Sequence, residues 1–353
     1  MSAARPGLHV RLIAPGLLGP MPGMQSAEFP WPDTPVLKRL LGRAEPHPGP
    51  VSRLALLKSH FLDADRLQGL AELSFMGEFG HRPRHPVLRA DAVHLRADRD
   101  RLVLFGPELL AVSSEEARAL AAAFDAHFGS EGLHLVPGAE GRGYLRLARM
   151  PEIETRPLEA MLGQPVADFL SRGREAAQWR RRLTEMQMLL ANHAVNLERQ
   201  VAGRPTINGL WCWGEGVAPR PRTGLDRHSV LHVDDPLFRG VAMHCGLELM
   251  EAPDFEQGFR VPESGREPWL FIDEIRLPAV YGELERWRER VSEFDRLWLA
   301  PAFRALRRGE IGILDLMPMN GRIYRLRRHR SWLLWRAEHP ARHAASMPVH
   351  HAD

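Results

Sequence analysis

Polar side chains that could bind a ligand are concentrated between residues 193 and 216. His193, Asn196 and Arg199 are spaced by three residues, so the first two share a face if the preceding helix continues this far. The segment that follows carries Asn208 and then ends in a glycine loop. A polar helix end beside an open glycine loop, at the end of a strand, is where α/β sheets usually bind ligands.

A short apolar strand is expected just before this loop. Trp211 and Trp213 are two residues apart, which puts both rings on one face of a strand. Gly214 and Gly216 allow a tight turn and the close approach of another group. The spacing alone favours a simpler interpretation, in which the tryptophans belong to the core and the glycines only form a turn.

The sequence of this stretch resembles that of a known family. It is similar to the His-Pro-Val-Asn…Arg…Gly-x-x-Pro-x-Asn…Trp-x-Trp-Gly-x-Gly segment of the archaeal-type cofactor-independent phosphoglycerate mutases, with Ala194 in place of the proline and Glu215 at a variable position. It resembles more closely the bacterial regulatory proteins of the RpfE type. The resemblance covers most of residues 8–335. It implies an alkaline-phosphatase-like α/β fold, a doubly wound sheet with a small inserted α+β domain.

A second similar stretch begins at Arg89. Its sequence resembles that of the RpfE-type proteins and, more distantly, the inserted domain of the mutases, through the motif Arg-Ala-Asp-x-Val-His-Leu-Arg-Ala-Asp-Arg-Asp. In the mutases an arginine at the matching place faces the site between the domains, so the resemblance implies that Arg89 contacts an anion. Without the resemblance, Arg89 would be interpreted as a salt-bridged surface residue.

The motifs that hold metal ions in the resembled enzymes are not recognisable here. The first strand should end in Asp-Gly, but this chain has Ala14-Pro15-Gly16, whose side chains offer no oxygen ligand. The strand at 269–275 is not followed by Asp-x-x-Gly-His, and Asp315 is not followed by His. Two-metal phosphoryl transfer requires clustered carboxylates and imidazoles. We therefore expect a degenerate family member with no catalytic residue, no metal site and no cofactor.

The nucleophilic serine of the family is not recognisable either. Ser52, Ser59 and Ser74 fall in the matching region, but none lies in a Gly-Ser-Asp context. A lone serine without a base or a metal is a weak nucleophile. Each is therefore interpreted as structural, with Ser52 as a residue near a helix cap.

Periodicity and turn residues predict the elements that position these side chains. A ββαββ order between residues 89 and 147 predicts the small α+β domain, and alternating strands and helices after residue 229 predict the wound sheet. Strands are expected at 8–14, 89–95, 102–105, 133–136, 144–147, 229–233, 247–250, 269–275 and 311–316, and a final hairpin at 322–326 and 332–335. Helices are expected at 33–43, 51–58, 63–75, 113–128, 176–191 and 236–245, and one long helix or a pair of helices at 283–306.

These elements suggest a division of the chain. Residues 1–80 and 186–338 are expected to form the two parts of the α/β core, 85–150 the inserted domain, 151–185 a crossing segment and 339–353 a disordered tail.

Composition limits the class of protein. The 353 residues, 44% of them hydrophobic, are ample for a large core. The sequence has no apolar run of about 18 residues and only two cysteines, which fits a bacterial cytoplasmic protein without a membrane span. The segment most like a basic patch contains Arg327, Arg328 and Arg330, and a solvated edge is the default interpretation, so nucleic acid is an unlikely partner.

Three functions remain open. The preferred one is a non-catalytic, regulatory mutase-like protein that binds a small, anionic or phosphorylated metabolite or a protein partner. The second is a metal-dependent phosphoglycerate mutase, or a related phosphotransferase or hydrolase, with substituted ligands. The third is an interaction scaffold that uses Arg327, Arg328 and Arg330.

Overall fold

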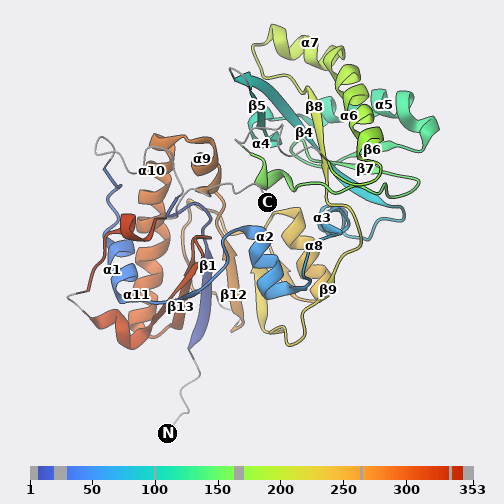
Figure 1. The fold of residues 1–353 in the computed structure, drawn as a ribbon. Helices are drawn as coiled ribbons and strands as arrows, with labels where there is room; N and C mark the ends of the chain where they lie inside the picture. The colour runs from blue at the N-terminus through green and yellow to red at the C-terminus, as the bar shows by residue number, and fades with distance from the viewer. Residues whose placement is uncertain are drawn as a thin grey trace. The chain divides into compact units, whose positions relative to one another are not determined.

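The computed structural model describes most of the chain, as two compact units (Figure 1). Unit 1 comprises Met1–Asp63, Pro221–Asp234 and Cys245–Asp353, and unit 2 comprises Ala64–Arg220 and Asp235–His244. The described residues are 7–19, 30–98, 101–162, 171–262, 265–333 and 336–344. No helix among them is long and apolar enough to cross a bilayer.

Unit 1 is built on a seven-stranded mixed sheet in the order β11-β10-β12-β1-β13-β14-β2. Its first five strands are parallel, and the last two pair in antiparallel fashion. The predicted α/β class is therefore confirmed. The strands are β1 (Leu8–Ile13), β2 (Glu45–Pro48), β10 (Ser229–His232), β11 (Glu248–Met250), β12 (Glu267–Phe271), β13 (Ile311–Met317) and β14 (Arg322–Arg327).

Helices cover one face of this sheet. Val10 and Leu12 lie two residues apart on β1 and so point to one face of the sheet, and with Leu314 of β13 they pack with the helices in one buried cluster. The helices are α1 (Pro35–Arg43), α10 (Leu284–Phe294) and α11 (Ala300–Arg308), seen side by side in Figure 1. The helix expected at 283–306 is interrupted by a π-helical turn, η5 (Asp295–Leu299). Asp295 in that turn caps α1 by accepting from the Leu37 backbone N–H at 2.6 Å.

The remaining elements of unit 1 differ in part from those expected. The helix expected at 51–58 is α2 (Arg53–Leu56) followed by a π-turn, η1 (Leu57–Phe61), and then β3 (Leu62–Asp63). A helix α9 (Arg276–Tyr281) follows β12.

The expected final hairpin is wrong, because β14 pairs with β13 and β2 instead. The chain continues from β14 into a 3-10 turn, η6 (Arg328–Trp332), and Leu334 and Trp335 lie outside the described residues. The expected disordered tail begins with an ordered turn, η7 (Pro340–His343), in which His343 Nε2 bonds to Glu338 at 2.7 Å. Residues 345–353 lie outside the described residues.

Unit 2 contains the predicted ββαββ unit and one further strand. Its sheet has the order β5-β4-β7-β6. The fifth strand, β8, pairs with β4 on the side opposite β7. The pairings of β4 with β5, β7 and β8 are antiparallel. The strands are β4 (Val87–Asp98), β5 (Arg101–Phe105), β6 (His134–Pro137), β7 (Gly143–Arg146) and β8 (Gly209–Trp213).

Two long helices, α5 (Ser114–Phe128) and α6 (Ala176–Ala191), pack on this sheet through a buried cluster that includes Phe124, Trp179 and Met186. Ser113 and Glu116 form the capping box that starts α5. The shorter elements of unit 2 are α4 (Pro107–Leu110), η2 (Gly129–Glu131), η3 (Leu158–Ala160), α7 (Ala194–Val201) and β9 (Arg220–Pro221), the last of which ends in unit 1.

The units do not follow the division drawn from the sequence. Residues 186–220 lie in unit 2, because β8 pairs along β4 from Arg89 opposite Trp213 to Val93 opposite Gly209. The helix expected at 63–75 is α3 (Leu70–Phe79), which begins after the left-handed Gly69 and also lies in unit 2. Helix α8 (Pro236–Cys245), all but its last residue in unit 2, crosses α3 closely at Gly240.

Candidate functional site

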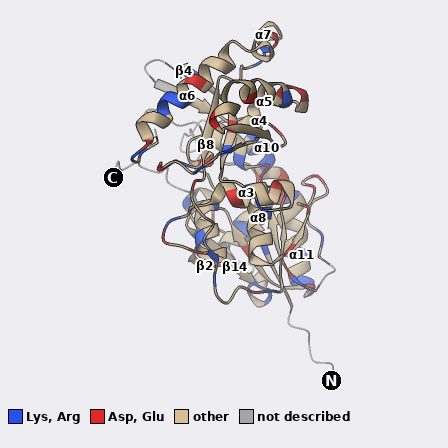
Figure 2. Cartoon of the chain, turned by 90° about the vertical axis from the view of Figure 1, so that its right-hand side faces the viewer, with Lys and Arg blue, Asp and Glu red and all other residues tan. Residues whose placement is uncertain are grey.

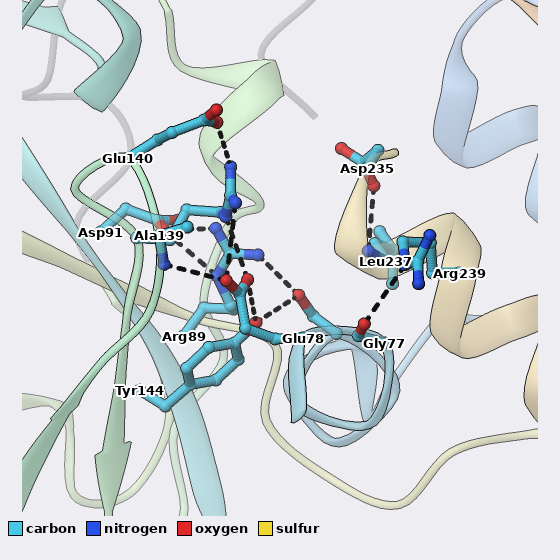
Figure 3. A network of polar contacts seen from close by, with 12 residues as sticks. Gly77, Glu78, Arg89, Asp91, Ala139, Glu140, Tyr144, Asp235, Leu237 and Arg239 are labelled. Carbon is cyan, nitrogen blue, oxygen red and sulfur yellow. Dashed lines mark hydrogen bonds and ion pairs between the residues drawn. The ribbon is translucent and has the colours of Figure 1, made fainter. Parts of the chain in front are cut away.

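Arg89 lies at the centre of a buried polar network in unit 2 (Figure 3). Arg89 and Asp91 are two residues apart on β4, so both side chains lie on one face of the strand. Arg89 Nε donates to Asp91 Oδ1 at 3.1 Å, and Nη1 donates to Ser74 Oγ of α3 at 2.6 Å. Arg89 is only 6% exposed, so its interpretation as a surface residue is wrong, although it is indeed ion-paired.

Two aromatic residues enclose this guanidinium. Tyr144 on β7 and Trp213 on β8 lie opposite Arg89 on the two neighbouring strands. Their ring centroids lie 5.3 and 5.4 Å from the guanidinium carbon, within the range of cation–π attraction. Trp213 Nε1 also donates to Asp91 Oδ2 at 2.7 Å. Burial alone would lower the pKa of Arg89, but the charge of Asp91 raises it overall, so the guanidinium stays charged.

The network continues along α3. Ser74 Oγ bonds to Tyr144 Oη at 2.9 Å, and Glu78 Oε2 lies 3.4 Å from the same phenol. Glu78 also accepts from Arg142 Nε at 3.0 Å. Burial raises the pKa of the Tyr144 phenol. Within the described chain the partners of the Ser74 hydroxyl are a guanidinium and a phenol, so this arrangement supplies no general base to activate it.

His193 and Asn196 lie in a different cluster, at the start of α7. His193 is the N-cap, where Nδ1 accepts from the Val195 backbone N–H at 3.2 Å. Asn196 is 1% exposed and donates to the carbonyls of Leu190 and Ile207 at 2.8 and 2.7 Å. Its Oδ1 accepts from Ile207 N at 2.7 Å. These bonds hold the chain that leads into β8.

Arg199 is fully buried in the same region. It donates to both carboxylate oxygens of Glu116 at 2.9 and 2.8 Å, and to the carbonyls of Leu110 and Pro205 at 3.0 Å. Burial alone would raise the pKa of Glu116, but the bonds from Arg199 and the Ser113 backbone lower it to about 2. The guanidinium therefore fastens α7 to the start of α5.

Asn208 and Trp211 also bond to main-chain groups. Asn208 Oδ1 accepts from Leu95 N at 2.7 Å, and Nδ2 donates to Leu95 O at 2.9 Å, which extends the pairing of β4. Trp211 Nε1 donates to Arg156 O at 2.8 Å.

The two loop glycines pass the start of α3. Gly214 has φ +86° and accepts from Ala71 N at 3.0 Å, and a Cβ there would lie 2.6 Å from that nitrogen. Gly216 has φ +96°, and a Cβ there would lie 2.9 Å from Cβ of Gln68. The structure thus brings Gly214 and Gly216 to the start of α3 and Arg89 to Ser74 of α3, with Trp213 packed against Arg89. It places the other predicted site residues elsewhere in unit 2, namely His193, Asn196, Arg199, Asn208 and Trp211. Their role in ligand binding remains a prediction.

The carboxyl ends of the parallel strands in unit 1 form a second candidate site. Ile13 of β1 lies opposite Phe271 of β12 and Met317 of β13, so the residues that follow these three strands meet at one edge. They are Ala14, then Ile272 and Asp273, and Pro318. An aspartate two residues after the end of a buried strand was a signal in the sequence that the prediction did not use.

Two arginines flank this aspartate. Arg53 Nη1 lies 3.6 Å from Asp273 Oδ2, and Arg276 Nε lies 3.5 Å from Oδ1. Ser52 is the N-cap of α2 and accepts from Ala55 N at 3.0 Å, as expected for a cap residue. Within the described ranges no group of three or more His, Cys, Asp or Glu residues could hold a metal ion. One carboxylate between two guanidiniums does not fit the donor set of a two-metal site.

Asp315 lies within β13, away from this edge. It is fully buried and accepts from Arg325 Nε and Nη2 at 2.8 and 2.7 Å. His9 Nε2 lies 2.8 Å from Asp315 Oδ2. Burial would raise the pKa of Asp315, but the bonds from Arg325 and His9 lower it to about 2. Asp315 is therefore part of a charged network across β1, β13 and β14.

Comparisons with known proteins give partial matches. The chain is 30% identical over 151 residues to a 2,3-bisphosphoglycerate-independent phosphoglycerate mutase of Methanosarcina barkeri. The matched region covers 40% of this chain and 36% of that protein. It is 26% identical over 208 residues to the enzyme of the same name from Methanosarcina mazei, and this matched region covers 54% of this chain and 52% of that protein. The chain thus spans about half or less of the length of the curated relatives it matches. No family model matches the sequence.

Two solved structures resemble the fold over more of its length. The cofactor-independent phosphoglycerate mutase of Thermoplasma acidophilum is 18% identical, with a TM-score of 0.47 over 96% of this chain and 95% of that one. The PH0037 protein of Pyrococcus horikoshii is 13% identical, with a TM-score of 0.45 over 88% and 82% of the two chains. On the sequence matches, this chain is phosphoglycerate-mutase-like over roughly half of its length.

Proposed function

We propose that this protein is a non-catalytic, phosphoglycerate-mutase-like protein that binds a small phosphorylated metabolite at the carboxyl edge of the unit 1 sheet. One observation supports the proposal: Arg53 and Arg276 flank Asp273 at the edge where the resembled enzymes hold metal ions. Guanidiniums attract phosphate directly, whereas divalent cations require oxygen and nitrogen ligands.

The charges at this edge favour an anion. Two guanidiniums and one carboxylate carry a combined charge of +1, and arginine stays protonated at any physiological pH. A phosphate that approaches this edge competes with Asp273 for the two guanidiniums, which limits the affinity and makes it sensitive to salt. Without a metal to stabilise the attacking and leaving oxygens, binding is expected without turnover.

Calorimetric titration in the presence of EDTA tests this proposal. 3-Phosphoglycerate is expected to bind, and glycerate, which lacks the phosphate, is not. Arg276→Gln should weaken 3-phosphoglycerate binding about tenfold, which corresponds to about 1.4 kcal/mol. Arg286→Gln is the matched control, because Arg286 is exposed on α10 and pairs with Glu283. Equal binding of glycerate, or equal losses in the two variants, would contradict the proposal.

The catalytic alternative makes a different prediction. A mutase with substituted ligands would interconvert 2- and 3-phosphoglycerate when Mn²⁺, Zn²⁺ or Mg²⁺ is added, and the purified protein would hold metal stoichiometrically. Turnover that exceeds the rate of a mock-purified sample would overturn the non-catalytic proposal. Ser52→Ala then identifies whether the cap serine of α2 takes part.

A separate observation favours a protein-interaction surface as a second candidate. Trp332 is 53% exposed, and the Arg307 guanidinium lies 3.9 Å from its ring centroid. Arg327 and Arg328 lie on the adjoining segment and are exposed. A regulatory partner with an acidic surface would lose binding when both are changed to Glu. Figure 2 shows that basic and acidic residues are mixed along much of the chain, so the charge of this segment is local.

A further inference from the structure

An arginine cluster lies in unit 1, where α1 and α11 both contact the turn η6. The two helices lie side by side in Figure 1. Arg43 of α1 is 4% exposed and donates to the carbonyls of Ser331 and Arg336 at 2.7 and 3.3 Å. Arg328 is exposed, and its Nε donates to the carbonyl of Arg307 on α11 at 3.2 Å. These bonds gather guanidiniums from segments that are distant in the sequence.

The positive charge of this cluster is not balanced by carboxylates. Burial lowers the pKa of Arg43, and the charges of Arg39 and Arg307 lower it further, so these guanidiniums are close enough to repel one another. Within the described part of the chain, no carboxylate forms an ion pair with Arg39, Arg43, Arg307 or Arg328. Cations held together without counterions raise the local concentration of anions. The cluster therefore favours an anionic ligand.

Trp332 of η6 provides a second, independent observation. The guanidinium carbon of Arg307 lies 3.9 Å from its ring centroid, so the guanidinium covers one face of the indole. The residue is nevertheless 53% exposed, which leaves the opposite face of the ring open to solvent. An open indole face beside unpaired arginines is the arrangement on which a nucleic-acid base stacks.

The two observations together distinguish between classes of anion. Guanidiniums bind carboxylates and phosphates alike, so the charge alone does not separate an acidic protein from a nucleic acid. The open face of Trp332 does, because each nucleotide joins a phosphate to a flat base, whereas acidic side chains leave the ring without a stacking partner. A duplex keeps its base faces inside the stack, so a single strand matches this surface.

We propose that the surface formed by Arg39, Arg307, Arg328 and Trp332 binds single-stranded nucleic acid. A base stacks on the open face of Trp332, and the neighbouring phosphates are attracted by the three arginines. Arg43 is too buried to contact the strand, and its charge adds to the positive potential. Nucleic acid was not expected from the sequence, because the arginines of α1 and α11 lie far along the chain from the segment around Trp332.

Fluorescence anisotropy of a labelled oligothymidylate of about 12 nucleotides, titrated with the full chain, tests the proposal. Two labelled probes of the same length are compared with it: an abasic strand, which keeps the phosphates but lacks the bases, and a polyglutamate peptide. The oligothymidylate should bind, and the other two should bind more weakly by about tenfold or more. No binding of the oligothymidylate, or equally tight binding of the abasic strand, would overturn the proposal. Equally tight binding of polyglutamate would also overturn it, in favour of an acidic protein partner.

Two variants connect binding to this surface. Trp332→Leu should weaken oligothymidylate binding about tenfold without changing its salt dependence, because it removes the stacking face and no charge. Arg328→Gln should reduce the slope of log K against log salt concentration by about 0.7, the value for one phosphate contact on a single strand. Arg288→Gln is the matched control, because Arg288 is an exposed arginine of α10 and its loss removes the same charge.

Equal effects at positions 288 and 328, or unchanged binding in Trp332→Leu, would refute the assignment. Trp332→Leu should bind 3-phosphoglycerate as the wild type does, so the nucleic-acid surface and the metabolite site fail separately.

Discussion

Arg89, Arg199 and Asp315 are buried charged residues, and each is paired with a side chain of opposite charge. Arg89 pairs with its neighbour on the strand, but Arg199 pairs with Glu116 of another helix, and Asp315 pairs with residues of two other strands. A buried charge without its partner is costly, so each of these pairs fixes the position of the elements that carry it.

Removing the counterion of Arg89 is expected to destabilise unit 2. Asp91→Asn leaves a buried guanidinium without its carboxylate, which should lower the free energy of unfolding by about 3–5 kcal/mol. Glu140→Gln is the control, because the Glu140 side chain is 79% exposed in its pair with Arg142, and its effect should stay within about 0.5 kcal/mol. Urea unfolding measures both values, and similar losses would contradict a structural role for the Arg89 pair.

The pH dependence of the free energy of unfolding should show how much the ionised Asp315 carboxylate stabilises the fold. Its pKa falls from 3.8 in the unfolded chain to about 2 in the folded protein. Its contribution is therefore complete above about pH 4 and is lost as the pH falls towards 2, and it amounts to about 2 kcal/mol. The stability difference between the wild type and Asp315→Asn should shrink by most of this amount between pH 5 and pH 2.5. A constant difference would show that the carboxylate is not held by Arg325 and His9.

At the scale of elements, sequence periodicity predicted the strands and helices whose formation depends on residues close together in the sequence. β1, β12 and β13 were recognised because their apolar residues alternate or run together, and α5 because its capping box is local. The pairing of β8 with β4 depends on residues more than 100 positions apart, so it was not predicted. For the same reason Asn196 and Arg199 were expected at a ligand site, although the groups that satisfy them lie on other segments.

The crossing of α3 and α8 tolerates no side chain at Gly240. A Cβ there would lie 1.7 Å from the Leu73 carbonyl oxygen, so the helices would have to separate. Gly240→Ala should cost about 3 kcal/mol, the upper part of the range for overpacking. Gly129→Ala is the matched control, because Gly129 has helical φ and ψ and its Cβ would meet no atom closer than 3.4 Å. Thermal unfolding should show a loss only for Gly240→Ala.

At the scale of the whole molecule, the proposed non-catalytic function predicts that no metal ion is needed to hold the fold. The described residues contain no group of three or more potential ligands, so stability should not depend on a bound ion. We expect dialysis against EDTA, followed by addition of Zn²⁺ or Mn²⁺, to change the melting temperature by less than about 2 °C. A larger and reversible change would indicate a metal centre and would favour the catalytic alternative.

The two units are interleaved along the chain, and this has a practical consequence. Unit 2 consists of the continuous stretch 64–220 and a separate segment, 235–244, which contains most of helix α8. A gene fragment cut at the ends of that stretch would expose the side of α3 that normally meets Gly240. Neither unit can be obtained by a single truncation, and a soluble unit 2 would require α8 to be rejoined through a new linker.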